Sequence, residues 1–194
     1  MNILALGSHP DDLEYGCGGT LLKFSNSGDR VFLFIATYGE HGGDSGIRRR
    51  EQERSAELIG AQELFWGGYK DTEIPLNQEL IQTIENVIKK INPEFIFIHD
   101  PKDTHQDHRV LSSCTLSATR YVKNFLFYEV PTTQDFTPNI FVDIEDVIEK
   151  KFDLLKAHKS QVDKTNIKDM NILELARSNA TFRGIQGRAR FAEG

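Results

Sequence analysis

Ile3-Leu4-Ala5-Leu6-Gly7-Ser8-His9-Pro10-Asp11-Asp12-Leu13-Glu14, close to the N-terminus, indicates the fold. The stretch begins with a short apolar run that is typical of a buried β-strand. One imidazole and two adjacent carboxylates follow directly, and the glycine-rich Gly16-Cys17-Gly18-Gly19 comes next. Open α/β sheets place their ligand sites beyond the carboxyl ends of the strands. The stretch therefore predicts a strand of such a sheet, with polar groups at its end.

Strand and helix patterns alternate along the rest of the chain. This alternation predicts an α/β, Rossmann-like domain of three layers, in which helices flank a mostly parallel sheet. The expected strands are short and apolar: Ile3–Leu6, Val31–Thr37, Glu63–Trp66, Phe95–His99, Phe125–Val130 and Asn139–Val142. The expected helices are Gly19–Ser27, Arg48–Ile59, Gln78–Ile91, Arg109–Val122, Ile144–His158 and Met170–Asn179. Because neither a repeat nor a linker divides the sequence, we expect residues 1–194 to form a single domain.

The composition is that of a soluble globular protein. Of the 194 residues, 39% are hydrophobic and 27% are charged. The formal charge of −6, without a basic tract, disfavours a nucleic-acid partner. No apolar run approaches the roughly 20 residues of a membrane span, and no basic segment typical of a signal peptide precedes the first strand. We therefore expect no integral membrane segment and a cytoplasmic location, and we leave open whether the chain forms a homo-oligomer.

The two cysteines, Cys17 and Cys114, are too few for a disulfide framework. Cys17 lies near the His-Asp cluster, so it could be a metal ligand or a nucleophile. We favour a packing role behind the glycine turn. Cys114 lies in an expected helix, where we expect it to belong to the core.

A second polar cluster, Asp103-Thr104-His105-Gln106-Asp107-His108, follows the expected strand at 95–99. A catalytic zinc site commonly uses three protein ligands and leaves a fourth position for water. One His and one carboxylate from the first cluster, with one His from the second, satisfy this count. One of the two adjacent carboxylates can bind the ion while the other faces the metal-bound water and takes its proton.

The two histidines of the second cluster are three residues apart, so they share one face if a helix begins there. One of them can bind the metal while the other stands over a substrate carbonyl. Asp107 could hydrogen-bond an imidazole and keep it protonated. The two clusters together indicate a metal-dependent hydrolase.

The clusters resemble the motifs of the PIG-L/LmbE-like zinc-dependent deacetylase family. They read His9-Pro10-Asp11-Asp12-x-Glu14, then Gly18-Gly19, and later His105-x-Asp107-His108. Three further segments are similar to family motifs: Ile47-Arg48-x-x-Glu51 with Ala56 and Gly60, the set Lys156, His158, Ser160 and Gln161, and Arg183-Gly184 through Ala192-Glu193. The similarity extends over nearly the whole chain.

The resemblance implies that His9, Asp12 and His108 bind zinc, and that Asp11 is the general base. Iron(II) or cobalt(II) could take the place of zinc in such a site. Family members remove the acetyl group from N-acetylglucosamine joined to another unit. The expected partner is thus a small amino-sugar conjugate, such as N-acetylglucosaminyl malate, a nucleotide- or lipid-linked sugar, or an antibiotic precursor.

The resemblance also implies roles for four other residues. His105, held charged by Asp107, would stabilise the oxyanion or protonate the leaving amine. Arg48 and Asp71 would contact the substrate.

The chain departs from the family pattern at two positions of the second cluster. Gln106 stands where the family usually has proline. Asp103 stands where some relatives carry a tyrosine that serves as an oxyanion donor. The second difference leaves the metal and His105 as the groups that could polarise a carbonyl.

Two other classes of function remain open from the sequence. One is a non-catalytic nucleotide-binding module whose Gly18-Gly19 turn holds a phosphate. However, the glycine spacing of a dinucleotide site does not follow the first strand. The other class keeps the metal but hydrolyses a different amide or a phosphoester.

Overall fold

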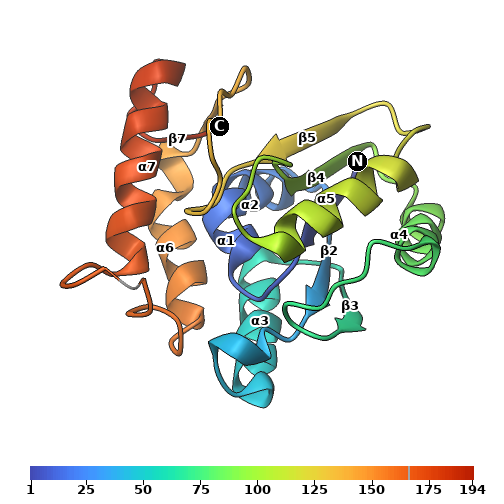
Figure 1. The fold of residues 1–194 in the computed structure, drawn as a ribbon. Coiled ribbons are helices and arrows are strands. Elements are labelled where there is room, and N and C mark those ends of the chain that lie inside the picture. The colour runs from blue at the N-terminus through green and yellow to red at the C-terminus, as the bar shows by residue number, and fades with distance from the viewer. Residues whose placement is uncertain (166) are drawn as a thin grey trace.

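The computed structural model describes residues 1–165 and 167–194. Five parallel strands form the central sheet in the order β3-β2-β1-β4-β5 (Figure 1). They are β1 (Asn2–Gly7), β2 (Arg30–Thr37), β3 (Glu63–Tyr69), β4 (Phe95–His99) and β5 (Phe125–Tyr128). The order reverses between β1 and β4, and ligands of open α/β sheets bind at such a point.

Helices cover both faces of this sheet, so the predicted three-layer α/β fold is confirmed. One face carries α4 (Gln78–Ile91) and α5 (Gln106–Ala118). The other carries α1 (Asp12–Gly16), α2 (Gly18–Asn26), α3 (Ser45–Ile59) and α6 (Ile148–Ala157), with α7 (Ile172–Gly187) packed against α6 (Figure 1). No helix of residues 1–165 and 167–194 is both long and apolar enough to cross a membrane.

The sequence of β1 shows why helices are needed on both faces. Ile3 and Ala5 belong to the core beneath α2 and α6, whereas Leu4 and Leu6 belong to the core beneath α4 and α5. Side chains alternate between the faces of a strand, so a continuous apolar run requires cover on both.

The prediction of a further strand at Asn139–Val142 is wrong. Only Val142–Asp143 is extended, as β6, and it pairs antiparallel with β7 (Ala192–Glu193) in a separate two-stranded sheet. Asn139 and Ile140 are exposed and follow Pro138, which has no N–H to donate to a ladder.

Helix boundaries shift where polar residues cap the first turn. α3 begins at Ser45, earlier than expected, because the Asp44 carboxylate accepts the N–H of Ile47 at 2.8 Å. α5 begins at Gln106 because His105 is its N-cap. Both helices therefore start earlier than expected, and both carry residues of the candidate site.

Glu193 ties β7 to the start of α2. Its carboxylate accepts the N–H groups of Gly19 at 2.8 Å and Thr20 at 2.7 Å, and it pairs with the buried Lys151. Glu193→Gln keeps the shape but removes the charge that compensates Lys151. We expect it to lower the free energy of unfolding by about 1–3 kcal/mol, measured by urea denaturation. The control is Glu149→Gln, which removes the same charge from the exposed pair of Glu149 with Arg177. It should change the free energy of unfolding by less than about 0.5 kcal/mol. Equal effects at the two positions would contradict a buried role for Glu193.

Candidate functional site

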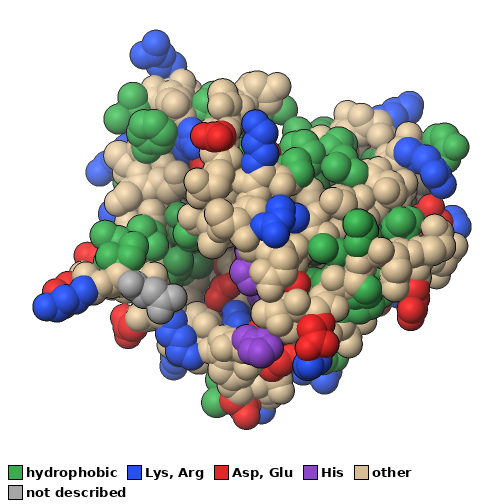
Figure 2. Space-filling view, in the orientation of Figure 1, with side chains coloured by type: hydrophobic (Ala, Val, Ile, Leu, Met, Phe, Trp, Pro, Cys, Tyr) green, Lys and Arg blue, Asp and Glu red, His purple; other side chains and the backbone are tan. Residues whose placement is uncertain are grey.

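A cavity of about 450 Å³ opens at the carboxyl ends of the strands. This volume lies within the range of small-molecule sites. Histidine and acidic side chains reach the surface in the hollow of the face shown in Figure 2. All eight residues that the sequence analysis singled out lie in or beside the cavity: His9, Asp11, Asp12, Arg48, Asp71, His105 and His108 line it, and Asp107 contacts His9 behind it.

His9, Asp12 and His108 approach one another closely. Nδ1 of His9 lies 3.3 Å from Nε2 of His108 and 3.4 Å from Oδ2 of Asp12, and Oδ1 of Asp12 lies 3.4 Å from Nε2 of His108. Ligand atoms about 2.0–2.1 Å from a tetrahedral ion lie about 3.4 Å from each other. All three side chains are buried. The cluster is therefore fit to hold a metal ion.

Three overlapping sets of His and Asp atoms are close enough for a shared ion. Each set contains His9 or His108: His9 with His105 and His108, Asp12 with His99 and His108, and His9 with Asp71 and Asp107. The backbone N–H groups of Ser8 and His9 hold Oδ2 of Asp12 at 3.0 and 2.7 Å. These two backbone hydrogen bonds thus fix the position of the Asp12 carboxylate within the cluster.

Opposite charges set the protonation of the cluster. Burial lowers the pKa of His108, but the charge of Asp12 and hydrogen bonds with Asp103 and Asp12 raise it to about 9. Burial raises the pKa of Asp12, but His108 and His99 hold it well below its usual range. A divalent cation would compete with protons for these groups, because metal ligands must be deprotonated.

Two carboxylates orient His9. Its Nε2 lies 3.1 Å from Oδ1 of Asp71 and 3.1 Å from Oδ2 of Asp107. A carboxylate on one ring nitrogen keeps the proton there and leaves the other nitrogen free for a metal. The free nitrogen here is Nδ1, which faces Asp12 and His108.

Asp71 was expected to contact a sugar, and it does line the cavity. However, both of its oxygens already have protein partners, because Oδ1 faces His9 and Oδ2 accepts the N–H of His41 at 2.9 Å. The contact that Asp71 makes in this structure therefore orients the His9 ring.

Asp107 was expected to hold His105 charged, but the structure pairs its carboxylate with other groups. The Asp107 carboxylate contacts His9 and accepts the N–H of Thr72 at 2.7 Å. His105 caps α5, and its Nδ1 accepts the backbone N–H of Asp107 at 3.2 Å. Burial and the neighbouring His9 and His108 lower the pKa of His105. Because Nδ1 accepts this hydrogen bond, the geometry favours a neutral ring with its proton on Nε2.

Asp11 has a left-handed backbone, with φ 91° and ψ −19°. Such a conformation is uncommon for a residue other than glycine, costs about 1–3 kcal/mol, and often marks functional sites. Burial raises the pKa of Asp11 to about 6, against the charges of Arg48 and His158. A carboxylate with this pKa can exchange a proton near neutral pH. Its side chain remains 29% exposed, towards the cavity.

Arg48 is buried, in contrast to its neighbours Arg49 and Arg50. Its Nη1 donates to the carbonyl of Gly39 at 2.7 Å. Its Nη2 donates to the carbonyl of Pro10 at 2.6 Å and lies 3.2 Å from Oδ2 of Asp11. The guanidinium lines the cavity, and its Nη2 holds the chain at Pro10 and Asp11.

Two site residues were missed by the sequence analysis. His99, the last residue of β4, stacks on His108 with ring centroids 3.9 Å apart, and its Nε2 lies 3.2 Å from Oδ2 of Asp12. Asp103 lies 3.2 Å from Nδ1 of His108. The signal for His99 was its place at the carboxyl end of a buried strand. Asp103 was included in the second polar cluster and noted as a departure from the family, but it was given no role in the site.

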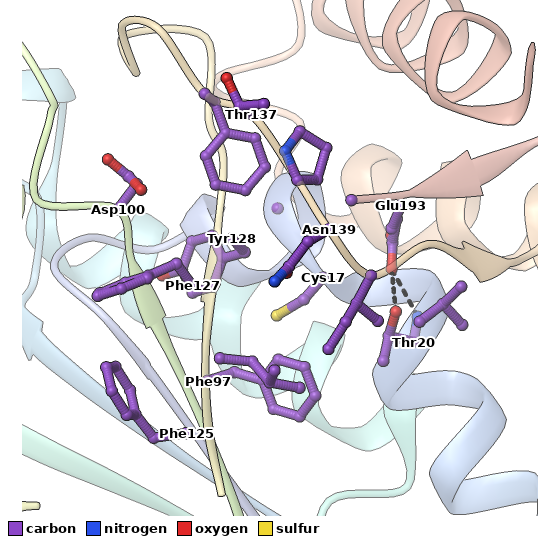
Figure 3. Close-up of a pocket in the computed structure, with 17 residues that line it drawn as sticks. Cys17, Thr20, Phe97, Asp100, Phe125, Phe127, Tyr128, Thr137, Asn139 and Glu193 are labelled. Carbon is purple, nitrogen blue, oxygen red and sulfur yellow. Dashed lines mark hydrogen bonds between the residues drawn. The ribbon is translucent and has the colours of Figure 1, made fainter. Parts of the chain in front are cut away.

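Cys17 lines a different cavity of about 340 Å³, beside β5 and the segment 136–142 (Figure 3). The groups close enough to hold a metal ion, among the described residues, do not include Cys17. Burial raises the pKa of its thiol well above the usual range, which makes the thiol unreactive. The favoured packing role agrees with this position, and Cys114 lies in the core as expected.

The Gly18-Gly19 turn is not open to a phosphate. The N–H groups of Gly19 and Thr20, which a bound phosphate would need, donate to the buried carboxylate of Glu193. This contact speaks against the nucleotide-binding alternative.

Comparison with known proteins identifies the family. Residues 4–119 match PIG-L, described as GlcNAc-PI de-N-acetylase. The chain is 34% identical over 168 residues to an uncharacterised deacetylase of Escherichia coli (strain K12), covering 81% of this chain and 90% of the relative. It is 32% identical over 185 residues to diacetylchitobiose deacetylase of Thermococcus kodakarensis, covering 82% of this chain and 69% of the relative. The solved structure of N,N'-diacetylchitobiose deacetylase from Pyrococcus horikoshii is similar with a TM-score of 0.85 and 28% identity, over 100% of this chain and 82% of that chain.

The matched region contains both polar clusters and every residue of the buried His/Asp group. The sequence match and the fold agree over most of the chain. This chain belongs to the PIG-L family.

Proposed function

We propose that the chain is a zinc-dependent N-deacetylase, which hydrolyses the acetamide of an N-acetylated amino sugar to a free amine and acetate. The observation that carries the proposal is the buried group of His9, Asp12 and His108, with the Asp11 carboxylate beside it in the cavity. The relatives that act on N-acetylated sugars support the substrate class.

We assign the metal to His9, Asp12 and His108, because these residues offer two imidazole nitrogens and one carboxylate at mutual distances that suit one ion. Zinc is the proposed ion, and iron(II) or cobalt(II) would suit the same ligands. When bound, such an ion polarises a carbonyl and lowers the pKa of water.

The residues around the metal position would carry the proton transfers. Asp11 accepts a proton from the attacking water and passes it to the nitrogen of the leaving amine. Arg48 holds the Asp11 carboxylate at 3.2 Å and stabilises its charged form. The neutral His105 donates its Nε2 proton in a hydrogen bond to the acetamide oxygen as negative charge develops there. Asp107 and Asp71 keep His9 in the orientation that exposes Nδ1.

The outer part of the cavity suits a small conjugate of the sugar. Tyr15, Ile172 and Leu175 offer apolar surface, and Thr132 and Gln161 offer hydrogen-bonding groups. A sugar ring presents both kinds of surface. We propose N-acetylglucosamine joined to a second unit, with Arg48 and Asp71 close to the sugar.

The test is release of free amine and acetate from diacetylchitobiose, N-acetylglucosaminyl malate and a nucleotide-linked N-acetylglucosamine, with metal content measured on the same sample. We expect turnover that a chelator abolishes and that added zinc, iron(II) or cobalt(II) restores. Phosphate release, or hydrolysis of unrelated amides alone, would favour the alternative of a different metal-dependent hydrolase. A metal-loaded protein that cleaves none of the acetamides would contradict the proposal.

A further inference from the structure

The left-handed backbone of Asp11 needs support from the surrounding chain. Asp11 lies between β1 and α1, and its side chain faces the cavity. An extended or helical backbone at this residue would turn the carboxylate in another direction. The contacts that hold the peptide bond before Asp11 therefore decide where its carboxylate points.

Helix α3 holds both polar groups of the peptide bond between Pro10 and Asp11. The carbonyl of Pro10 accepts from Nη2 of Arg48 at 2.6 Å, and the N–H of Asp11 donates to Oε1 of Gln52 at 3.2 Å. Arg48 and Gln52 are four residues apart, on one face of the helix. The peptide plane is thus fixed at its oxygen and at its nitrogen.

Gln52 can accept from Asp11 only if its amide is correctly oriented. Its Nε2 donates to Oε1 of Glu14 at 2.8 Å, and both side chains are fully buried. An ionised carboxylate only accepts hydrogen bonds. Glu14 therefore requires the NH2 group of Gln52 on its own side and places the amide oxygen towards Asp11.

Glu14 is itself held in place. Its Oε1 also accepts from the hydroxyl of Ser55 at 2.6 Å, and its Oε2 lies 3.6 Å from Nε2 of the buried His158. Ser55 is three residues after Gln52 on the same face of α3. The side chains from His158 to Gln52 are therefore all buried, and Gln52 connects them to the N–H of Asp11.

We propose that Gln52 is a positioning residue for the reaction: together with Arg48 it fixes the peptide bond before Asp11, and Glu14 keeps its amide in the required orientation. The proposal rests on the proposed role of Asp11 as the general base. Neither Gln52 nor Glu14 is expected to touch the substrate, because both are fully buried.

The first test is Gln52→Met, which keeps an unbranched side chain of similar length but removes the acceptor. We expect kcat to fall about tenfold, as is usual when a partner that orients a reacting group is lost, with KM and metal content unchanged. The matched control is Thr20→Val, which removes a buried hydrogen bond to Glu193 remote from the cavity. It should lower the melting temperature and leave kcat unchanged. Unchanged kcat in Gln52→Met, or an equal fall in both variants, would overturn the proposal.

Exchanging the side chains of Glu14 and Gln52 should restore the activity that a single substitution removes. Gln52→Glu alone places a second carboxylate against Glu14, and Glu14→Gln alone frees the amide of Gln52 to rotate. The double variant E14Q/Q52E restores one donor and one acceptor between the positions, with an acceptor left for Asp11. We expect it to recover most of the kcat lost in Q52E. A double variant no more active than Q52E would contradict the assigned orientation.

A measurement without substrate separates this inference from the proposed function. Hydrogen exchange of the Asp11 amide should be faster in Gln52→Met than in the wild type, and unchanged in Thr20→Val. If the wild type releases no acetate, the proposed function fails, and this exchange still decides whether Gln52 holds the peptide. Equal exchange in the wild type and Gln52→Met would overturn the positioning role even in an active deacetylase.

Discussion

His108→Ala should leave the protein without stoichiometric metal and without measurable deacetylation. His108 lies on the first turn of α5, and its Nε2 lies 3.4 Å from Asp12 and 3.3 Å from His9. A site with three protein ligands that loses one imidazole binds the metal ion more weakly and no longer holds it in the geometry that catalysis requires. Metal content by elemental analysis and acetate release on the same preparation measure the two effects.

The control for this variant is His41→Ala. His41 also lines the cavity, but its ring is exposed and does not belong to the groups that could hold a metal among the described residues. We expect His41→Ala to keep stoichiometric metal. A fully loaded, active His108→Ala would disprove the proposed metal site.

The sequence was sufficient to predict that the two polar clusters meet at one edge of the sheet. Apolar runs placed β1 and β4, and the polar clusters began directly after them. In a parallel sheet all carboxyl ends meet at one edge, so clusters distant in sequence had to approach each other. For the same reason His99, the last residue of β4, could have been added to the candidates.

The pairing within the site could not be predicted, because it depends on where each loop turns. Asp107 was expected beside His105, which is close in sequence, but it contacts His9 from the other cluster. As the N-cap of α5, His105 turns its ring back onto the backbone of its own helix, and the Asp107 carboxylate faces His9 and Thr72 instead. Spacing along the chain does not determine such a choice.

The two shortest strands, β6 and β7, could not be predicted for a different reason. β6 and β7 have two residues each, too few to show any alternation of polar and apolar side chains. Glu193 belongs to β7, and its carboxylate accepts two N–H groups at the start of α2. The contact also explains why a glycine turn that resembles a phosphate site does not serve as one.

Asp11→Asn should retain stoichiometric metal and lose about 10²–10⁴-fold in kcat, as expected when a general base is removed. Asparagine tolerates the left-handed backbone of this residue and keeps the shape of the side chain, so the fold should be preserved. The amide cannot take up the proton of the attacking water.

We expect the opposite result for the adjacent carboxylate, that of Asp12. Asp12→Asn changes the same functional group one residue further on, but Asp12 lies between the two imidazoles of the proposed metal site. It should lose metal, and activity should fall because metal is lost. Elemental analysis of the two variants, with acetate release at saturating metal, separates the roles. Metal loss in Asp11→Asn would make Asp11 a ligand, and retained metal in Asp12→Asn would remove Asp12 from the ligand set. The proposed mechanism requires opposite results from these neighbouring residues, because one carboxylate binds the ion and the other moves the proton.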